Sequence, residues 1–155
     1  MSKSVRRVES ALAAAGAGRR ILDLGDCRTA ADAAASAGCE IDQIAKSIIF
    51  RGEDSGHCLL FLTAGGNRVD PAKAAALAGE ALGKADADLV RAETGFAIGG
   101  VAPVGHLRPL RSFWDSRLDD FAEIWAAAGT PRHVFAIAPA QLRAITGAEP
   151  GDFTA

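Results

Sequence analysis

The segment IDQIAKSIIFRGEDSGHCLLFLTA, residues 41–64, carries the clearest structural signals of this chain. Residues 45–51 are rich in β-branched and aromatic side chains, which is typical of a strand. The polar connection GEDSG, residues 52–56, predicts a hairpin-type turn. Residues 57–64 are almost entirely apolar and predict a buried partner strand. The sequence therefore predicts a central strand hairpin, around which the other elements are arranged.

Helices and further strands are expected on both sides of this hairpin. Capping residues, prolines in first turns and glycines after last turns predict helices over residues 4–16, 29–38, 71–82, 86–95 and 139–147. Further strands are expected over residues 19–25, in a short segment ending at Asp115, and over residues 132–138. Periodicity leaves residues 121–129 open between strand and helix. This interspersed pattern predicts a mixed α/β or α+β fold: a mixed, barrel-like sheet of about five to seven strands flanked by helices, forming one domain over residues 1–155.

Composition excludes several broad classes of protein. The 155 residues are 49% hydrophobic and 23% charged, with a formal net charge of −2. These values argue against an intrinsically disordered chain, and no window approaches the roughly 20 apolar residues of a membrane span. Glu9 interrupts the apolar stretch that a signal peptide would need, so we expect an ordinary first helix there. The odd number of cysteines and the absence of C-x-x-C spacing favour a reducing, cytoplasmic setting.

Positive charge is concentrated slightly toward the N-terminal third. Up to Arg51 there are eight Lys and Arg against six Asp and Glu, whereas the remainder has nine against thirteen. A polyanion would therefore meet the first third of the chain first. The alternative is that these are scattered, solvated charges. The basic residues concerned are Arg6, Arg7, Arg19, Arg20, Arg28, Lys46 and Arg51.

Lys46 is the first candidate functional residue, because it interrupts an apolar strand. Strand alternation predicts that its side chain shares a face with Ile44 and Ile48. A lysine in this position either extends to the edge of the sheet and into water, or lines a cavity. In a cavity, its ammonium group would suit a phosphate or a carbonyl oxygen.

The second candidate is the glycine-rich segment GGVAPVG, residues 99–105. Glycine allows main-chain N–H groups to approach a ligand closely, and Pro103 stiffens the loop. The segment matches neither the phosphate-binding G-x-x-x-x-G-K-[ST] pattern nor the dinucleotide G-x-G-x-x-G pattern. Taken alone, it also fits an ordinary tight turn, and we expect no nucleotide cofactor.

Histidines and cysteines form no recognisable metal or nucleophile motif. His57, His106 and His133 lack metal-ligand spacing, so we expect no metal ion. Structural or surface roles are expected for these histidines, with His106 notable because it follows the glycine-rich segment. Cys27 or Cys58 would need a nearby base to act as a nucleophile. Asp115 and the pair Asp119–Asp120 fit a strand-end turn and a solvated cap, although a role in a site stays open.

Four segments together resemble the YbaK/EbsC family, whose fold is that of the editing insertion domain of bacterial prolyl-tRNA synthetase. The resemblance extends from about Val5 to Asp152, and its most specific marks are the lysine of IAKSIIF and the G-x-x-x-P loop at residues 99–103. The four segments are AAxxAGCEIDQIAKSIIFR (33–51), LFLTAGGNRVD (60–70), TGFAIGGVAPVGH (94–106) and WAAAGTPRHVFAIAPAQLRAITGA (125–148).

This resemblance implies hydrolysis of mischarged tRNA in trans, most often tRNA-Pro carrying alanine, cysteine or a similar small residue. It implies that Lys46 is the functional lysine and that Gly99 and Gly100 present main-chain donors beside the aminoacyl ester. Positioning and stabilisation of the oxyanion would suffice, because the ester is already activated. Further residues implied at the substrate are Ala30, Ala33, Ala34, Val101, Pro103 and His106.

Three functions remain open at this stage: a freestanding aminoacyl-tRNA deacylase, a non-catalytic nucleic-acid-binding or regulatory module on the same fold, and a hydrolase of small esters. The deacylase would contact the acceptor end of tRNA, with prolyl-tRNA synthetase as a possible partner and no membrane association. The chain shows no interface stripe, so a monomer is expected.

Overall fold

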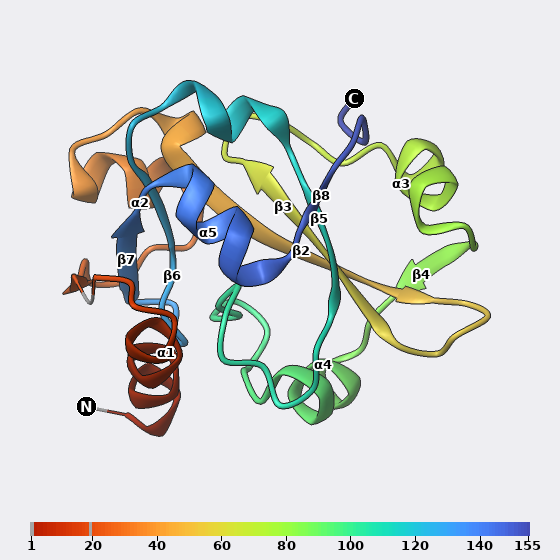
Figure 1. The fold of residues 1–155 in the computed structure, drawn as a ribbon, viewed down its shortest axis with the longest axis horizontal. Coiled ribbons are helices and arrows are strands. Elements are labelled where there is room, and N and C mark those ends of the chain that lie inside the picture. The colour runs from red at the N-terminus through yellow and green to blue at the C-terminus, as the bar shows by residue number, and fades with distance from the viewer. Residues whose placement is uncertain (1, 19) are drawn as a thin grey trace.

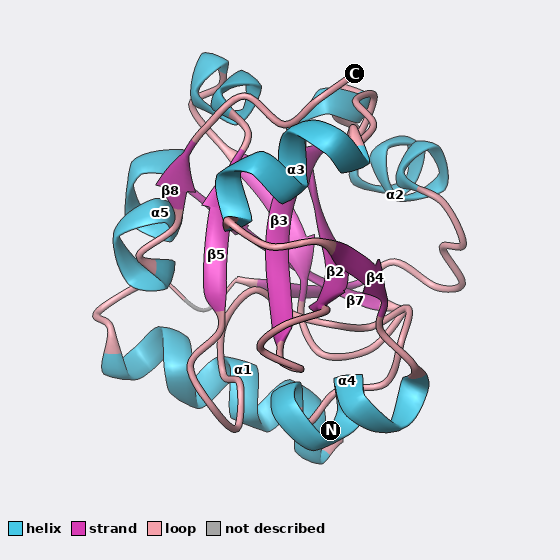
Figure 2. Ribbon diagram, turned by 90° about the vertical axis from the view of Figure 1, so that its right-hand side faces the viewer, coloured by secondary structure: helices cyan, strands magenta, loops and turns pink. Residues whose placement is uncertain are grey.

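The computed structural model describes residues 2–18 and 20–155. Its strands form one eight-stranded mixed sheet with helices packed around it (Figures 1 and 2). The strand order is β1-β7-β6-β2-β3-β5-β8, and β4 pairs with β2 outside this path. The strands are β1 (Ile21–Asp23), β2 (Ile44–Gly52), β3 (Cys58–Ala64), β4 (Leu82–Lys84), β5 (Arg111–Trp114), β6 (Ile124–Ala127), β7 (His133–Ile137) and β8 (Glu149–Pro150). The predicted mixed α/β class is confirmed.

The hairpin of β2 and β3 is the centre of the sheet, as the sequence predicts. Seven consecutive antiparallel pairs join the two strands, from Ala45↔Ala64 to Arg51↔Cys58. All of β3 is buried, because β5 pairs with its other edge and helices cover both of its faces. A strand with both edges paired and both faces covered must be apolar throughout.

The other edge of β2 is paired only at its two ends. β6 runs parallel to β2 at Ile44 and Ala45, and β4 pairs antiparallel from Phe50 to Gly52. Between these contacts, residues 46–49 have no strand partner on this side within the described part of the chain. We call this stretch the open edge of β2.

Five α-helices pack around the sheet, and their ends follow the sequence signals for helix caps. Thr29 Oγ1 accepts the Asp32 N–H at the start of α2, and Gly38, with φ of 73°, ends that helix. The five helices are α1 (Lys3–Ala14), α2 (Ala30–Ala37), α3 (Pro71–Ala78), α4 (Ala87–Thr94) and α5 (Pro139–Thr146), and short 3₁₀ turns cover residues Ile41–Gln43 and Ser116–Asp120.

Apolar side chains form one large cluster and two smaller ones. The large cluster joins one face of the sheet to α1, α4 and α5 through residues such as Leu12, Val90 and Leu142. In both views, α1 and α4 lie at the same end of the molecule (Figures 1 and 2). The smaller clusters lie under α3, around Phe61, and under α2, around Trp125. The two faces of the sheet therefore carry separate apolar layers.

Some predicted boundaries are wrong, for local reasons. The third helix ends at Ala78 rather than near residue 82, because Gly79 adopts φ of 76° and its N–H donates to the Ala75 carbonyl. The chain then forms the short strand β4. Residues 149–150, for which the sequence analysis predicts no strand, pair with β5 as β8. These two short strands take the count past the expected seven. The segment 121–129, which periodicity left open between strand and helix, contains the strand β6. Arg19, at the start of the predicted strand 19–25, lies outside the described residues.

Candidate functional site

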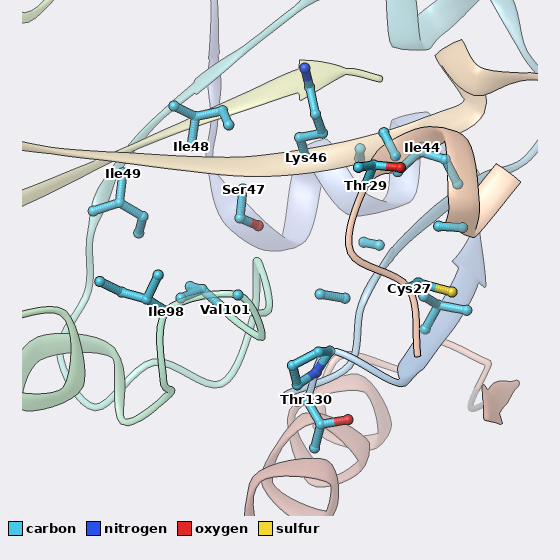
Figure 3. A pocket seen from close by; sticks show the side chains of 18 of the residues that line it. Cys27, Thr29, Ile44, Lys46, Ser47, Ile48, Ile49, Ile98, Val101 and Thr130 are labelled. Carbon is cyan, nitrogen blue, oxygen red and sulfur yellow. The ribbon is translucent and has the colours of Figure 1, made fainter. Parts of the chain in front are cut away.

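A cavity of about 500 Å³ opens where the pairing of β2 is interrupted (Figure 3). It lies between α2, the open edge of β2, the loop after α4 and the turn that joins β6 to β7. Its volume falls in the usual range for small-molecule sites, roughly 300–1,000 Å³. The β2 residues that line it are consecutive, from Ile44 to Ile49. Because neighbouring side chains point to opposite faces, this run indicates that the strand edge itself borders the cavity.

The α2 side of the cavity is built from small residues. Ala30 and Ala33 line the cavity, whereas Ala34 packs behind them against Trp125 and Ile44. Alanine favours the helix but leaves space in front of it. Two of the three alanines predicted at the substrate therefore border the cavity.

Lys46 borders the cavity, but its ammonium group points to the opposite face of β2 from Ser47 and Ile49 (Figure 3). Its Nζ donates to the Asn67 carbonyl oxygen at 2.6 Å. Burial, followed by the positive charge of Arg68, lowers the pKa of Lys46 below its usual value, while Asp115 and Asp42 act in the opposite sense. The side chain shares its face with Ile48, as strand alternation predicts.

The glycine-rich loop contributes Gly99 and Val101 to the cavity. Gly99 has φ of +93°, a left-handed conformation that favours glycine. No described residue accepts its N–H. Gly100 differs, because its N–H donates to the Ala97 carbonyl at 3.0 Å and a Cβ there would lie 2.8 Å from Thr130 Cα. The structure thus explains Gly100 by close packing and a turn, rather than by an available donor.

Pro103 and His106 lie away from this cavity. Both border a smaller hollow on the other side of the loop, together with residues of α1 and α5. The His106 Nε2 lies 2.6 Å from the Ala102 carbonyl oxygen, and burial lowers the pKa of this imidazole. These two residues support the shape of the loop, and the geometry does not bring them to the cavity with Lys46 and Gly99.

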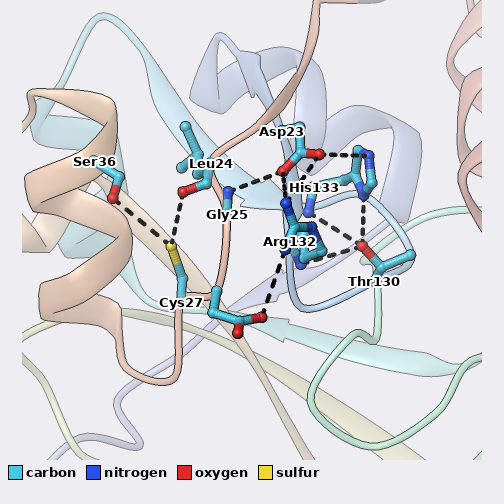
Figure 4. A network of polar contacts seen from close by, with 9 residues as sticks. Asp23, Leu24, Gly25, Cys27, Ser36, Thr130, Arg132 and His133 are labelled. Atoms are coloured by element: carbon cyan, nitrogen blue, oxygen red, sulfur yellow. Dashed lines mark hydrogen bonds and ion pairs between the residues drawn. The ribbon is translucent and has the colours of Figure 1, made fainter.

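The sequence analysis missed polar residues that the fold brings to the cavity. Ser47 points into the space between β2 and Val101 (Figure 3), and its Oγ is buried without a hydrogen-bond partner. Strand alternation predicts that Ser47 lies on the opposite face from Lys46, but the sequence does not show that this edge of the strand is unpaired. Thr130 and His133 also line the cavity, with Thr130 Oγ1 2.7 Å from His133 Nδ1. Figure 4 shows this pair beside Asp23, whose Oδ2 lies 3.8 Å from His133 Nε2.

The ionised side chains at the cavity are cationic. Arg28 and Lys84 border it together with Lys46, and no Asp or Glu is among the described residues that line it. This local excess of positive charge contrasts with the net charge of −2 for the whole chain. It makes the cavity suitable for an anionic ligand.

The cysteines offer no activated nucleophile. Cys58 is buried, and burial followed by the neighbouring Glu93 raises the pKa of its thiol to about 11. Cys27 borders the cavity, but its Sγ contacts the Leu24 carbonyl and the Ser36 hydroxyl at 3.9 Å, and neither group is a base. Within residues 2–18 and 20–155, no cluster of His, Cys, Asp and Glu suits a metal ion, and none of the helices has the length and apolar character to cross a membrane.

One curated protein gives a partial match. The chain is 30% identical over 114 residues to the uncharacterized protein YwhH of Bacillus subtilis (strain 168). This alignment covers 74% of the present chain and 72% of YwhH.

Solved structures match over almost the whole chain. A crystal structure described as that of a candidate trans-editing enzyme for prolyl-tRNA synthetase is 46% identical, with a TM-score of 0.93 and coverage of 100% of this chain and 99% of the other. The hypothetical protein APE2540 is 27% identical, with a TM-score of 0.86 and coverage of 96% and 99%. The family model for the aminoacyl-tRNA editing domain matches residues 25–145, a range that includes the α2 wall, the open edge of β2 and the glycine-rich loop. The chain therefore belongs to the aminoacyl-tRNA editing domain family.

Proposed function

We propose that this protein is a trans-editing hydrolase that removes a wrong small amino acid from mischarged tRNA, with tRNA-Pro carrying alanine, cysteine or a similar residue as the substrate. The observation that carries the proposal is the cavity at the open edge of β2. It combines a wall of small residues, an available main-chain donor at Gly99 and an excess of positive charge. The similarity to a candidate trans-editing enzyme for prolyl-tRNA synthetase supports the choice of tRNA-Pro.

The proposed chemistry is attack of water on the aminoacyl ester. The ester is already activated, so no covalent nucleophile is required, and catalysis depends on positioning and on stabilisation of the oxyanion. The Gly99 N–H is a loop donor available for that oxygen, whereas Gly100 shapes the loop. Lys46 supplies positive charge for a phosphate of the terminal nucleotide or for the ester carbonyl. The attacking water would be oriented by the main chain or by the ribose hydroxyl of the tRNA.

Substrate selection by size follows from the α2 wall. Ala30 and Ala33 leave room for a small side chain, and larger side chains would meet the helix. One methylene group changes such discrimination by only about 1–3 kcal/mol, so neighbouring small amino acids should be hydrolysed at related rates. The charges of Arg28, Lys46 and Lys84 would hold the acceptor end with few phosphate contacts. This arrangement would allow an acidic chain to bind tRNA.

The experiment is a deacylation panel. Transfer RNA for proline is charged with alanine, cysteine, serine, 2-aminobutyrate or proline, and loss of the label is followed with wild type and with Lys46→Ala. We expect rapid release of one or two wrong amino acids, retention of proline, and a loss of at least about 100-fold in Lys46→Ala, since this variant removes the positive charge proposed for a phosphate or for the ester carbonyl. Lys73→Ala is the matched control, because Lys73 lies on α3 and pairs with the exposed Asp152.

The two remaining functions have distinct outcomes. Tight binding of tRNA without release of any amino acid would point to a binding module, and Lys46→Ala would then weaken binding and reduce its salt dependence. Equal hydrolysis of free aminoacyl esters, with no gain from the tRNA, would point to a small-ester hydrolase. Either result would overturn the proposal.

A further inference from the structure

The open edge of β2 presents main-chain groups to the cavity. The Gly52 N–H donates to the His57 carbonyl, so the even-numbered residues of β2 direct their N–H and C=O groups toward β3. The odd-numbered residues direct theirs to the other edge. Glu53 fits this pattern, because its N–H donates to the Ala81 carbonyl on the side of β4. Ser47 and Ile49 therefore direct one N–H and one C=O each into the interruption between β6 and β4, where no described strand pairs with them.

The hydroxyl of Ser47 lies at the same place and is also unpartnered. Its Oγ is buried, and it projects from β2 toward Val101 among apolar neighbours that include Ile49 and Ile98 (Figure 3). A buried hydroxyl without a partner is unfavourable, and such groups in native proteins call for an explanation. Rotation about χ1 between staggered positions is the movement by which this hydroxyl would reach a ligand on the strand edge.

Apart from Ser47, the cavity offers an amino group few side-chain acceptors. No Asp or Glu is among the described residues that line it. The Thr29 hydroxyl accepts the Asp32 N–H, and the Thr130 hydroxyl is engaged with His133. The β2 acceptors that face the cavity, namely the Ser47 hydroxyl and the main-chain carbonyls of Ser47 and Ile49, have no partner among the described residues.

We infer that the open edge of β2 is the binding site for the α-amino group of the substrate, with Ser47 as its recognition residue. The amino group donates to the Ser47 hydroxyl and to a main-chain carbonyl of the edge. The aminoacyl group then lies along β2 as a one-residue extension of the sheet, as a peptide does on an exposed strand edge. This inference rests on the proposed deacylase function and adds the chemical group by which the substrate is recognised.

The test compares esters that differ only at the α-carbon. The tRNA is charged with alanine, with lactate, which replaces the amino group by a hydroxyl, or with propionate, which lacks both groups. Each enzymatic kcat/KM is divided by the spontaneous hydrolysis rate of the same ester. We expect the wild type to prefer the alanyl ester to the propionyl ester by at least about tenfold, the effect of one lost hydrogen bond. The lactyl ester should fall between them.

Ser47→Ala is expected to reduce the preference for alanyl over propionyl by about fivefold or more, while hydrolysis of the propionyl ester is nearly unchanged. Ser116→Ala, which alters an exposed serine outside the cavity, should leave the preference intact. An equal effect of Ser47→Ala on all three esters, or no effect, would overturn the inference. A preference for seryl-tRNA that disappears in Ser47→Ala would also overturn it, because the hydroxyl would then bind the substrate side chain. Failure of the wild type to hydrolyse any ester would refute the proposed function instead.

Discussion

The two edges of β2 are made from the same nine residues but serve different purposes. Toward β3, seven consecutive pairs join the strands, and the buried partner strand supplies the centre of the core. Toward β6 and β4, pairing is interrupted over residues 46–49, and a cavity occupies the space. The paired edge should therefore govern stability, and the open edge should govern activity. A break in a ladder of strand hydrogen bonds can therefore indicate where a functional site lies.

The largest expected effect tests the paired edge. Phe61 is fully buried on β3, and its ring stacks on Phe113 at 4.7 Å between centroids. Phe61→Ala should lower the free energy of unfolding by about 3–5 kcal/mol, because it removes a large core side chain and leaves a cavity. Denaturant titration measures this loss. The relative rates on different aminoacyl-tRNAs should stay the same for the folded fraction, and a changed substrate preference would contradict the division between the two edges.

The next effect concerns the loop that faces the open edge. A Cβ at Gly100 would lie 2.8 Å from Thr130 Cα and 2.9 Å from Thr130 C, so Gly100→Ala must displace main chain. We expect a loss of about 1–3 kcal/mol in unfolding free energy and at least about a tenfold drop in deacylation, because Gly99 and Thr130 line the cavity. Gly18→Ala is the matched control, since nothing lies within 4 Å of a Cβ there. Wild-type deacylation by Gly100→Ala would show that the reaction does not depend on the position of the glycine-rich loop.

The hairpin was predictable because its cues are local. Residues 41–64 contain two apolar runs and one polar turn, and a full ladder follows from that pattern. β4 and β8 were not predictable, because three- and two-residue strands depend on partners distant in sequence. Lys46 and the glycine-rich loop could be singled out as candidates from the sequence. Ser47 could not, because the feature that distinguishes it, an unpaired strand edge, exists only after β6 and β4 have taken their places.

A smaller effect should separate the α2 wall from the rest of its helix. Ala30 lines the cavity, whereas Ala35 on the same helix is exposed. Ala30→Leu should reduce kcat/KM for alanyl-tRNA by about tenfold, because the added atoms occupy space that the substrate needs. Ala35→Leu should have no such effect. Both variants should change the free energy of unfolding by less than about 1 kcal/mol. Equal activities of the two variants would show that the substrate does not approach α2.

The smallest effect concerns the far side of the glycine-rich loop. His106 is held at the Ala102 carbonyl, and burial followed by the charge of Arg7 keeps the pKa of its imidazole below the usual value. As the pH falls below about 6.5, the imidazole of His106 is protonated in the unfolded chain but stays neutral in the folded protein. The folded state therefore loses stability as the pH falls. One such proton changes the free energy of unfolding by at most about 1.4 kcal/mol per pH unit.

His106→Gln keeps an N–H donor but does not titrate. Unfolding free energies measured between pH 7.5 and 5 should therefore fall less steeply with acidification in this variant than in wild type. If the unfolding free energies of wild type and variant depend equally on pH, the titration of His106 does not contribute to the acid sensitivity of the fold. A weaker pH dependence in the variant would show that His106, on this side of the loop, contributes to the stability of the protein. Unchanged substrate preference at pH 7.5 would show that substrate recognition depends on the side of the loop that faces the open edge of β2.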